Sequence, residues 1–554
     1  MRGREVFMSS FVAHGVKKIF GNPGTTENPL LESLLEYPEI EYITALHEGV
    51  AVCAAGNYSQ ASGEISVANV HVAPGLGNAI GMMFGCLKSQ LPVIITAGQQ
   101  DNRMRLREPL LSHDLVAMAK PVTKWAAEPQ SADEMAAIMH KAMTIATTHP
   151  QGPVFISLPN NVMEQETELA AQAPSEAPTN LVANTGIEAL ADKVLAAENI
   201  AICPGDDFGK YGASAALAEF VEATGADIYT DFLKARLPIN MDHPAVRGTF
   251  PATAKGVRAL LNGYDLVIAG GGITMEEVWY DATAKLPPEC YYARIENHGA
   301  ALTQRAPDLS LIGDLGSTMA ALTAAIKDKA DANFDTAAAA RKEAQSELRQ
   351  ARITKFEERL AKTQGKEPLA APEALSVLAA NLPDDVVIVD ESITAQGDLA
   401  GAFRSLSPDH YFANRGGGIG QGLAGALGTA VARPDAPVVV VSGDGSAMYS
   451  IQALWSAAHH NLNLLFVILA NAEYRVLKHN LDIHRSRFDA PSDQPYPHMD
   501  LANPGLGFVD MASGMGVPAL RAGNTAEIEQ GVQNYLSQSG PYLLEIAIAG
   551  KGDS

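Results

Sequence analysis

The stretch between residues 442 and 471 constrains the fold more than any other part of the chain. It contains, in order, the segment Ser442-Gly443-Asp444-Gly445-Ser446, a stretch of helical character from Ser450 to His460, the apolar run Leu464–Leu469 and Asn471. Another apolar run, Val438–Val441, precedes it. This order predicts a strand, a tight glycine turn, a helix and a second strand. Two strands joined through a helix are typical of a parallel sheet covered by helices.

The polar residues of this stretch indicate the kind of ligand. Gly443 and Gly445 allow the backbone to turn sharply and to approach a ligand closely. Asp444 places a carboxylate at the carboxyl end of a parallel strand, where such sheets bind ligands. A carboxylate, an amide oxygen such as that of Asn471 and backbone carbonyls suit Mg²⁺ or Ca²⁺, and magnesium takes further ligands from phosphate oxygens. The stretch therefore predicts a site for a metal-bridged diphosphate.

Composition limits the other possibilities. The chain has 554 residues, 47% of them hydrophobic and 19% charged, which is enough to build the cores of about three ordinary domains. The formal net charge of -23 disfavours nucleic acids and anionic membranes as partners, because the electrostatic term would oppose binding. The four cysteines are scattered without metal-ligand spacing. With no visible signal peptide and no apolar window of membrane-spanning length, we expect a cytoplasmic enzyme acting on small molecules.

Apolar runs alternate with helical stretches along most of the chain, which predicts α/β domains with parallel sheets covered on both faces. We expect a first domain at residues 1–178, a central domain at 183–330, a helical linker at 331–368 and a last domain at 369–554. The stretch Gln172–Asn180 is expected to link the first two domains. The predicted strands are Lys18–Phe20, Glu41–Thr44, Ile65–Val70, Val93–Thr96, Val154–Leu158, Ile200–Cys203, Ala226–Tyr229, Leu266–Ala269, Leu309–Ile312, Val386–Val389, Val438–Val441 and Leu464–Leu469.

Two separated motifs resemble those of a known superfamily. Gly443-Asp444-Gly445 followed by Asn471 is similar to the diphosphate-binding motif of the thiamine-diphosphate-dependent 2-oxo acid decarboxylases and acetolactate synthases. Leu46-His47-Glu48-Gly49-Val50-Ala51 resembles the segment that carries the cofactor-activating glutamate in that superfamily. Alone, each motif has an ordinary explanation, because Gly-Asp-Gly triplets are common in turns and a glutamate near a helix start often acts as a cap.

The resemblance implies three doubly wound parallel-sheet domains, of which residues 1–178 bind the pyrimidine of the cofactor and residues 369–554 bind its diphosphate. It implies thiamine diphosphate as the cofactor and Mg²⁺ or Ca²⁺ as the metal. Glu48 is implied to activate the cofactor through a hydrogen bond to its pyrimidine ring. The other implied cofactor-binding residues are Asn78, Ser392, Thr394, Gly417, Ile419, Gly443, Asp444, Gly445, Ser446 and Asn471. The implied metal ligands are Asp444, Asn471 and Glu473.

The first domain narrows the resemblance to the benzoylformate decarboxylases. The matching segments are Gly21–Asn28, Asn69–His71, Ala73–Ala79, Ile95–Gln100, Lys124-Trp125 and Pro150–Val154. By that match Thr25 stands where a hydroxyl contacts the substrate carboxylate, and His71 stands where a histidine donates or accepts a proton. Without the match, a single histidine after a strand is more often a structural residue.

The central domain departs from the benzoylformate decarboxylase pattern. Those enzymes use a second histidine there, but the segment Ile273–Tyr280 contains none. The residues that could take its place are Glu276, Glu277, His113, His479 and His484, although each is more often an exposed residue. The proton-transfer set is therefore left open.

Arg475 is a second departure, because it stands where the relatives have glycine near the substrate pocket. If Arg475 faces inward, the substrate carries a second anionic or polar group. If it faces outward, it belongs to a solvated helix face.

These features predict the non-oxidative decarboxylation of a 2-oxo acid to an aldehyde. The alternatives within the superfamily are carboligation, as in acetolactate synthases, and the cleavage catalysed by 2-hydroxyacyl-CoA lyases. A regulatory protein that binds the cofactor without turnover would be favoured by loss of Glu48, Asp444 or Asn471, and all three are present. Superfamily precedent places Glu48 and Asp444 of different subunits around one cofactor, which implies a homodimer at least and favours a homotetramer.

Overall fold

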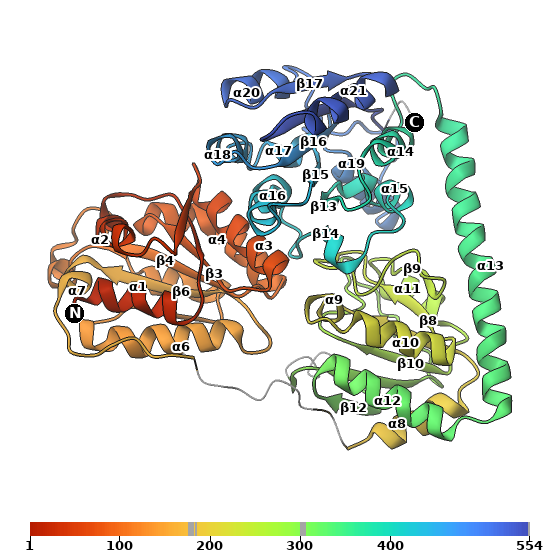
Figure 1. Cartoon of the computed structure of the whole chain (residues 1–554). Helices are drawn as coiled ribbons and strands as arrows, with labels where there is room; N and C mark the ends of the chain where they lie inside the picture. The colour runs from red at the N-terminus through yellow and green to blue at the C-terminus, as the bar shows by residue number, and fades with distance from the viewer. Residues whose placement is uncertain (175–181, 183–184, 300–305, 552–554) are drawn as a thin grey trace. The chain divides into compact units, whose positions relative to one another are not determined.

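The computed structural model of the chain describes residues 1–174, 182, 185–299 and 306–551. Three six-stranded sheets of parallel strands organise these residues, with helices against the faces of each sheet (Figure 1). This arrangement confirms the predicted α/β fold with three doubly wound sheets. Most of the predicted linker Gln172–Asn180 lies outside the described residues. Within the described part of the chain, no helix is both long and apolar enough to cross a membrane.

The first sheet has the strand order β2-β1-β3-β4-β6-β5. Its strands are β1 (Lys18–Gly21), β2 (Glu41–Thr44), β3 (Ser66–Val70), β4 (Val93–Gln99), β5 (Trp125–Ala127) and β6 (Val154–Pro159). The helices of this region are α1 (Gly3–Ala13), α2 (Asn28–Ser33), α3 (Glu48–Ser62), α4 (Val72–Lys88), α5 (Leu115–Ala119), α6 (Met135–Thr147) and α7 (Asn160–Glu164). The strand order reverses between β1 and β3, and open α/β sheets bind ligands at the carboxyl ends of such a pair.

The second sheet has the order β12-β11-β10-β7-β8-β9. Its strands are β7 (Ile200–Pro204), β8 (Asp227–Thr230), β9 (Val246–Thr249), β10 (Leu266–Gly270), β11 (Tyr291–Glu296) and β12 (Leu309–Ile312). The helices are α8 (Ile187–Ala196), α9 (Asp207–Lys210), α10 (Ser214–Thr224), α11 (Ala254–Leu261) and α12 (Leu315–Lys329). Here the order reverses between β7 and β10.

The third sheet has the order β14-β13-β15-β16-β18-β17, and it reverses between β13 and β15. Its strands are β13 (Val387–Glu391), β14 (Tyr411–Phe412), β15 (Val438–Gly443), β16 (Leu464–Ala470), β17 (Ala519–Ala522) and β18 (Tyr542–Ala547). The helices are α14 (Ala371–Asn381), α15 (Gln396–Ala402), α16 (Gln421–Ala432), α17 (Asp444–Ala447), α18 (Ala453–His459), α19 (Arg475–Arg487), α20 (Phe508–Gly514) and α21 (Thr525–Leu536).

The central strands of the third sheet explain why residues 438–471 have such a clear pattern in the sequence. All four valines of Val438–Val441 and the apolar residues Leu464–Ile468 are fully buried. Strands that are covered by helices on both faces have continuous apolar runs instead of alternating ones. The runs therefore form β15 and β16 in register, with Val438 opposite Leu464.

A long polar helix, α13 (Ala332–Thr363), lies within the stretch predicted as helical at 331–368. Phe334 and Ala338 of this helix join the apolar core of the second unit, and two polar side chains donate to backbone carbonyls before β8. Arg341 Nη2 donates to the carbonyl of Thr224 at 2.7 Å, and Gln345 Nε2 donates to that of Gly225 at 2.9 Å. These contacts hold a helix that has few apolar residues to bury.

The chain divides into two compact units. One unit contains the first and third sheets, from Met1–Ser175, Leu360–Phe403 and Phe412–Ser554. The other contains the second sheet and most of α13, together with the short segment Arg404–Tyr411. Within this second unit, Arg236 Nη2 donates to Asp409 Oδ1 at 2.6 Å, which ties that segment to the second sheet's connections.

Candidate active site

The carboxyl ends of β13 and β15 border the switch point of the third sheet, and a recess lies there. The recess is lined by Ser392–Ala395, Ile419, Gly443–Ser446, Leu469, Asn471, Glu473–Val476 and Ile548. It brings together predicted residues that follow three different strands. Of the predicted cofactor-binding residues, Gly417, Glu48 and Asn78 do not line it.

Asp444 begins α17 and is 4% exposed. Its Oδ1 accepts the N–H of Gly445 at 2.8 Å, and its Oδ2 accepts the N–H of Ala472 at 2.7 Å. Burial raises the pKa of Asp444; the backbone N–H donors oppose this rise, and the negative charge of Glu473 adds to it. Each carboxylate oxygen has a second lone pair, so a bound divalent cation would offset the cost of burying this charge.

The two glycines beside Asp444 lie where the strand passes into a helix. β15 ends at Gly443 and α17 begins at Asp444, and neither glycine has a positive φ. Gly445 is required for space, because a Cβ there would lie 2.4 Å from the ring of Tyr474. A Cβ on Gly443 would have no atom within 4 Å, so the backbone at Gly443 is open on that side.

Asn471 and Glu473 flank Ala472, which has a φ of +55°. Asn471 Oδ1 accepts the N–H of Glu473 at 3.1 Å. Glu473 is 8% exposed, and both oxygens of its carboxylate have partners. Oε2 pairs with Lys478, and Oε1 accepts the N–H of Lys551 at 2.6 Å. The backbone carbonyl of Glu473 is therefore the group that this residue can most readily offer to a metal.

Ser392 and Thr394 enclose another residue in the left-handed region, Ile393, with a φ of +50°. A β-branched residue in this conformation is strained, and such strain gathers at functional sites. The hydroxyl of Ser392 donates to Asp390 Oδ1 at 2.6 Å, whereas Thr394 is exposed. Ile393 and Ala472 are thus two strained residues that follow the carboxyl ends of β13 and β16, beside the same recess.

The loop before α16 contains the predicted residues Gly417 and Ile419. Gly416, Gly417 and Gly420 have φ values of +101°, +70° and +89°, which side chains rarely adopt. A Cβ on Gly420 would also lie 2.4 Å from Cβ of Tyr449. The glycines give the loop a conformation that brings Ile419, but not Gly417, to the recess.

Glu391, at the end of β13, anchors that loop. Its carboxylate accepts the N–H groups of Gln421 at 2.8 Å and Gly422 at 3.0 Å, and the hydroxyl of Ser442 at 3.1 Å. Burial raises the pKa of Glu391 to about 7, although these donors oppose the rise. The carboxylate connects β13, β15 and the start of α16 directly beneath the recess-lining segments.

Glu48 begins α3 and is 6% exposed. The cap of this helix is His47, whose Nδ1 accepts the N–H of Gly49 at 3.0 Å, so the capping explanation does not account for Glu48. The carboxylate of Glu48 instead accepts a hydrogen bond from Asn78 Nδ2 at 3.1 Å. A Cβ on Gly75 would lie 2.7 Å from Glu48 Oε1, which shows how closely α4 approaches this carboxylate.

Within one chain, α3 packs against α16. Cys53 Sγ donates to the carbonyl of Gln421 at 3.3 Å, and a Cβ on Gly428 would lie 1.8 Å from the carbonyl oxygen of Ala54. The helix that begins at Glu48 therefore lies on the helix that follows the glycine loop. The predicted sharing of the site between subunits stays a prediction.

The predicted residues Thr25 and His71 follow β1 and β3, at the switch point of the first sheet. Thr25 is exposed, and His71 Nδ1 lies 2.9 Å from Oε2 of Glu27. Glu27 is 2% exposed, and its Oε1 accepts the N–H of Gly98 at 2.8 Å. The contact holds the imidazole through Nδ1. Glu27 lay within a matched segment, but its role was not predicted.

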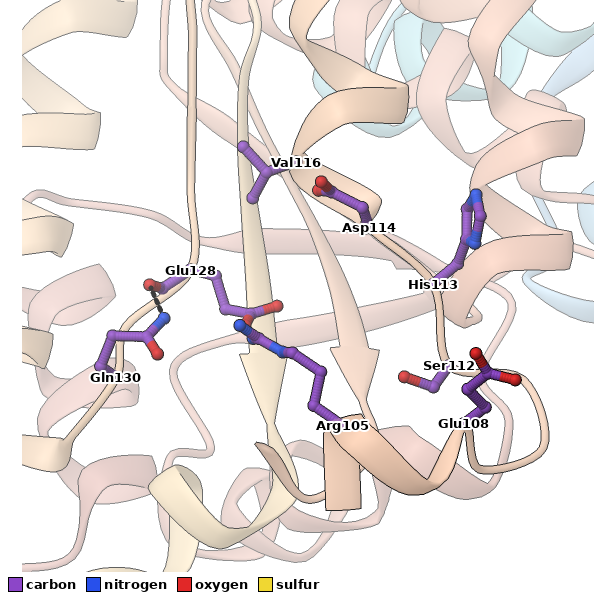
Figure 2. Close-up of a pocket in the computed structure, with 8 residues that line it drawn as sticks. All are labelled: Arg105, Glu108, Ser112, His113, Asp114, Val116, Glu128 and Gln130. Carbon is purple, nitrogen blue, oxygen red and sulfur yellow. Dashed lines mark hydrogen bonds and ion pairs between the residues drawn. The ribbon is translucent and has the colours of Figure 1, made fainter. Parts of the chain in front are cut away.

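A cavity of about 640 Å³ lies elsewhere, near the carboxyl ends of the first sheet's strands (Figure 2). It contains His113, one of the open candidates for a second proton-transfer residue, together with Arg105 and Glu128, which form an ion pair. None of its lining residues lines the recess. His113 therefore has a place in a polar cavity but not beside Asp444.

The other candidates for the missing histidine also lie outside the recess walls. Glu277 pairs with Lys285 at 2.6 Å, and Glu276 begins the same exposed segment of the second unit. His479 and His484 are exposed residues of α19. Among the described residues, no cluster of three or more His, Cys, Asp or Glu side chains could hold a metal, so a metal here would need amide and backbone oxygens.

Models of known protein families match three parts of the chain. The thiamine pyrophosphate enzyme models match in three parts: the N-terminal TPP binding domain at residues 1–118, the central domain at 187–322 and the C-terminal TPP binding domain at 394–546. The two TPP binding matches include Glu48 and Asp444, respectively.

Individual proteins are similar over nearly the whole chain. The benzoylformate decarboxylase of Pseudomonas aeruginosa is 30% identical, over 96% of this chain and 96% of its own. The acetolactate synthase isozyme 2 large subunit of Escherichia coli is 24% identical, over 99% and 96% of the two chains. The structure of benzoylformate decarboxylase from Polynucleobacter necessarius superposes with a TM-score of 0.86 at 25% identity, covering 99% of both chains.

Proposed function

The chain belongs to the thiamine pyrophosphate enzymes, and from this we propose that it decarboxylates a 2-oxo acid to the corresponding aldehyde. The observation that carries the proposal is the recess in which Asp444 and Asn471 lie beside the segment Ser392–Ala395. A carboxylate and an amide at the switch point of a parallel sheet suit a metal-bridged diphosphate. The 30% identity with a benzoylformate decarboxylase supports the decarboxylase over other members.

The residues present fit thiamine diphosphate. The open backbone at Gly443 and the positive φ angles around Gly417 leave room where side chains would obstruct a ligand. Thr394 and Ser446 offer hydroxyl groups to a diphosphate, and Ile419 offers an apolar surface to the organic part of the cofactor. When bound, the cofactor supplies the electron sink that decarboxylation requires.

For the metal we propose Mg²⁺ or Ca²⁺, with Asp444 and Asn471 as side-chain ligands. Glu473 would contribute its backbone carbonyl, because its carboxylate is engaged by Lys478 and by the N–H of Lys551. Such a set leaves coordination positions for phosphate oxygens, which is how magnesium is usually held by proteins.

Three residues of the first domain would handle protons and substrate. Glu48 is buried and keeps one donor, Asn78, so its carboxylate is placed to hydrogen-bond a ring nitrogen of the cofactor. His71, oriented by Glu27, would donate or accept the proton of the reacting carbon, and the exposed hydroxyl of Thr25 would contact the substrate carboxylate.

Carboligation is the second candidate, and the similarity to an acetolactate synthase large subunit favours it. In that reaction the carbon that loses carbon dioxide would form a bond to a second carbonyl compound instead of taking up a proton. We also propose a homodimer at least, and a homotetramer as the favoured assembly.

The test is carbon dioxide release by protein loaded with thiamine diphosphate and Mg²⁺, across aromatic, branched, straight-chain and dicarboxylic 2-oxo acids. Release with free aldehyde as the product supports the proposal. Release that requires a second carbonyl compound supports the carboligase instead, and no release from any acid by cofactor-loaded protein contradicts both.

Two variants assign the residues. Glu48→Gln should keep cofactor affinity within a few-fold and lose about 10²-fold or more in turnover. Asp444→Asn should lose the metal dependence of cofactor binding. Unchanged turnover in the first variant, or unchanged metal dependence in the second, would remove that residue from the proposed site.

A further inference from the structure

Arg475 is the first residue of α19, and it lines the recess that also contains Asp444 and Asn471. Its Nη1 donates to the carbonyl of Ala549 at 3.1 Å, which fixes the guanidinium on one side. Its Nε is buried and has no hydrogen-bond partner among the described residues. A buried N–H of a charged group without an acceptor is costly, so the guanidinium of Arg475 keeps hydrogen-bonding capacity that the described residues do not meet.

Among the described residues, Arg475 also has no acidic partner, unlike the two lysines nearby. Lys478 pairs with Glu473 and Asp500, and Lys551 pairs with Asp482. For Arg475, no acidic side chain in the described part of the chain lies within 4.0 Å. The solvated helix face considered from the sequence therefore does not describe this residue, whose charge is partly buried at the wall of the recess.

The position of Arg475 on its helix strengthens the attraction for anions. It stands at the amino-terminal end of a helix of 13 residues, followed by Val476, which also lines the recess. The first N–H groups of a helix lack intrahelical acceptors, and the helix dipole favours negative charge there. The guanidinium and the helix end therefore act on the same side of the recess.

We propose that Arg475 binds a second anionic group of the substrate, so that the enzyme is selective for dicarboxylic 2-oxo acids; this inference rests on the proposed function. The carboxylate next to the keto group leaves as carbon dioxide. An ion pair from Arg475 to that carboxylate would stabilise the ground state and slow its departure. The group that Arg475 binds must instead persist through the reaction, which is the distal carboxylate.

The diphosphate of the cofactor is the other anion that could reach this wall. Its negative charge would be balanced by a metal held by Asp444 and Asn471, which follow β15 and β16. Hydrogen-bond donors of the segment after β13 would also contribute. The two sources are distinguished by measuring the affinity for the cofactor separately from the affinity for the substrate.

The main experiment compares 2-oxoglutarate with 2-oxovalerate, which have the same number of carbons but differ in the distal carboxylate. Wild type should have the higher kcat/KM for 2-oxoglutarate. Arg475→Gln should lower that value about 10- to 100-fold, as expected for a lost charged hydrogen bond, and should change the value for 2-oxovalerate less than about 3-fold. Arg475→Lys should keep part of the preference, because it retains the charge but loses the planar donor set.

Arg487→Gln is the matched control, because it removes the same charge from an exposed position of the same helix outside the recess. It should alter neither acid's kcat/KM. The melting temperatures of all three variants should match that of wild type. Equal losses for both acids in Arg475→Gln, or a wild type without preference, would overturn the proposal.

Two binding measurements separate this inference from the proposed function. The dissociation constant of thiamine diphosphate should be the same in Arg475→Gln and wild type, and a tenfold rise would assign Arg475 to the diphosphate instead. Calorimetry on cofactor-loaded Glu48→Gln should show tighter binding of 2-oxoglutarate than of 2-oxovalerate, and adding Arg475→Gln should abolish the difference. If this binding difference is found but wild type releases no carbon dioxide, the role of Arg475 is supported and the decarboxylase proposal is rejected. If wild type decarboxylates 2-oxo acids without preferring 2-oxoglutarate, the decarboxylase proposal is supported and the role of Arg475 is rejected.

Discussion

At the scale of single residues, the contact between Glu27 and His71 predicts a loss of turnover that depends on charge. Oε2 of Glu27 lies 2.9 Å from Nδ1 of His71, and Glu27 is held by the N–H groups of Gly24 and Gly98. Glu27→Gln keeps the size of the side chain but replaces the carboxylate at Nδ1 of His71 with an amide, so the contact that orients the imidazole is weakened. We expect kcat to fall by about 10- to 100-fold, while the cofactor affinity is unchanged.

The control for that prediction is a pH–rate profile. If Glu27 acts through His71, the pH–rate profile of Glu27→Gln should differ in shape from that of wild type, and His71→Ala should show the same change. A uniform reduction at every pH would mean that Glu27 only supports the local fold.

The backbone of Ala472 predicts a stabilising substitution. Ala472 has a φ of +55°, a conformation that glycine adopts without strain. Ala472→Gly should raise the free energy of unfolding by up to about 1 kcal/mol, offset partly by the greater freedom of glycine in the unfolded chain. Differential scanning calorimetry measures the change, with Ala470→Gly in the preceding strand as a control that should destabilise. A lower melting temperature in Ala472→Gly would show that the alanine methyl contributes more than the strain costs.

The structure brings together several residues that the sequence motifs singled out, and these lie on local stretches of chain. Asp444, Asn471 and Ser446 lie on a short piece of chain whose strand ends can be recognised, and the structure places all three in one recess. Glu27 was missed because its partner Gly98 comes from another strand, 71 residues away. The left-handed conformations of Ile393 and Ala472 were missed because neither residue type signals a positive φ.

At the scale of elements, Glu391 predicts a pH dependence of stability. Burial raises its pKa from 4.5 to about 7. Between these values the folded protein binds more protons than the unfolded chain, so this group's stabilisation is complete below pH 4.5 and is lost as the pH rises toward 7. The loss amounts to about 3 kcal/mol.

The measurement is the melting temperature of wild type and Glu391→Gln between pH 5 and pH 8. The variant should be destabilised at every pH, because an amide cannot accept all the donors at the start of α16, but its melting temperature should fall less steeply with pH. Parallel curves for the two proteins would contradict the assignment.

The sequence predicted most strands that have an uninterrupted apolar run, but it did not predict β18, and it did predict the partly exposed β2 and β12. The runs at β15, β16 and β10 are continuously apolar, which makes them visible in the sequence. Strand β11 was not predicted, because Arg294 and Glu296 interrupt its apolar run; both are buried, and they pair with each other and with the backbone of Gly272. Strand β14 has two residues, too few for any periodicity.

At the scale of the whole molecule, the two compact units predict separate responses to the cofactor. The proposed cofactor residues, from Glu48 to Asn471, all belong to the unit that contains the first and third sheets. Ligand at about 100 times its dissociation constant stabilises the state that binds it by about 2.7 kcal/mol. Thiamine diphosphate with Mg²⁺ should therefore raise the melting temperature of that unit and leave the other transition unchanged.

Calorimetric scans with and without the cofactor check this, and a chelator should reverse the shift by removing the metal. Asp444→Asn should show no metal-dependent shift. If both transitions move together, the units unfold as one, and the division into two stability units is wrong.

The close contact between Gly428 and the carbonyl of Ala54 has a consequence for natural variation. A single methyl group at position 428 would collide with backbone, not with a side chain that can rotate away. Position 443, by contrast, has open space for a methyl group and would be restricted only when a ligand must pass close to it. In a saturation library selected for soluble expression alone, position 428 should therefore return almost only glycine, whereas position 443 should accept small residues until selection for catalysis is imposed.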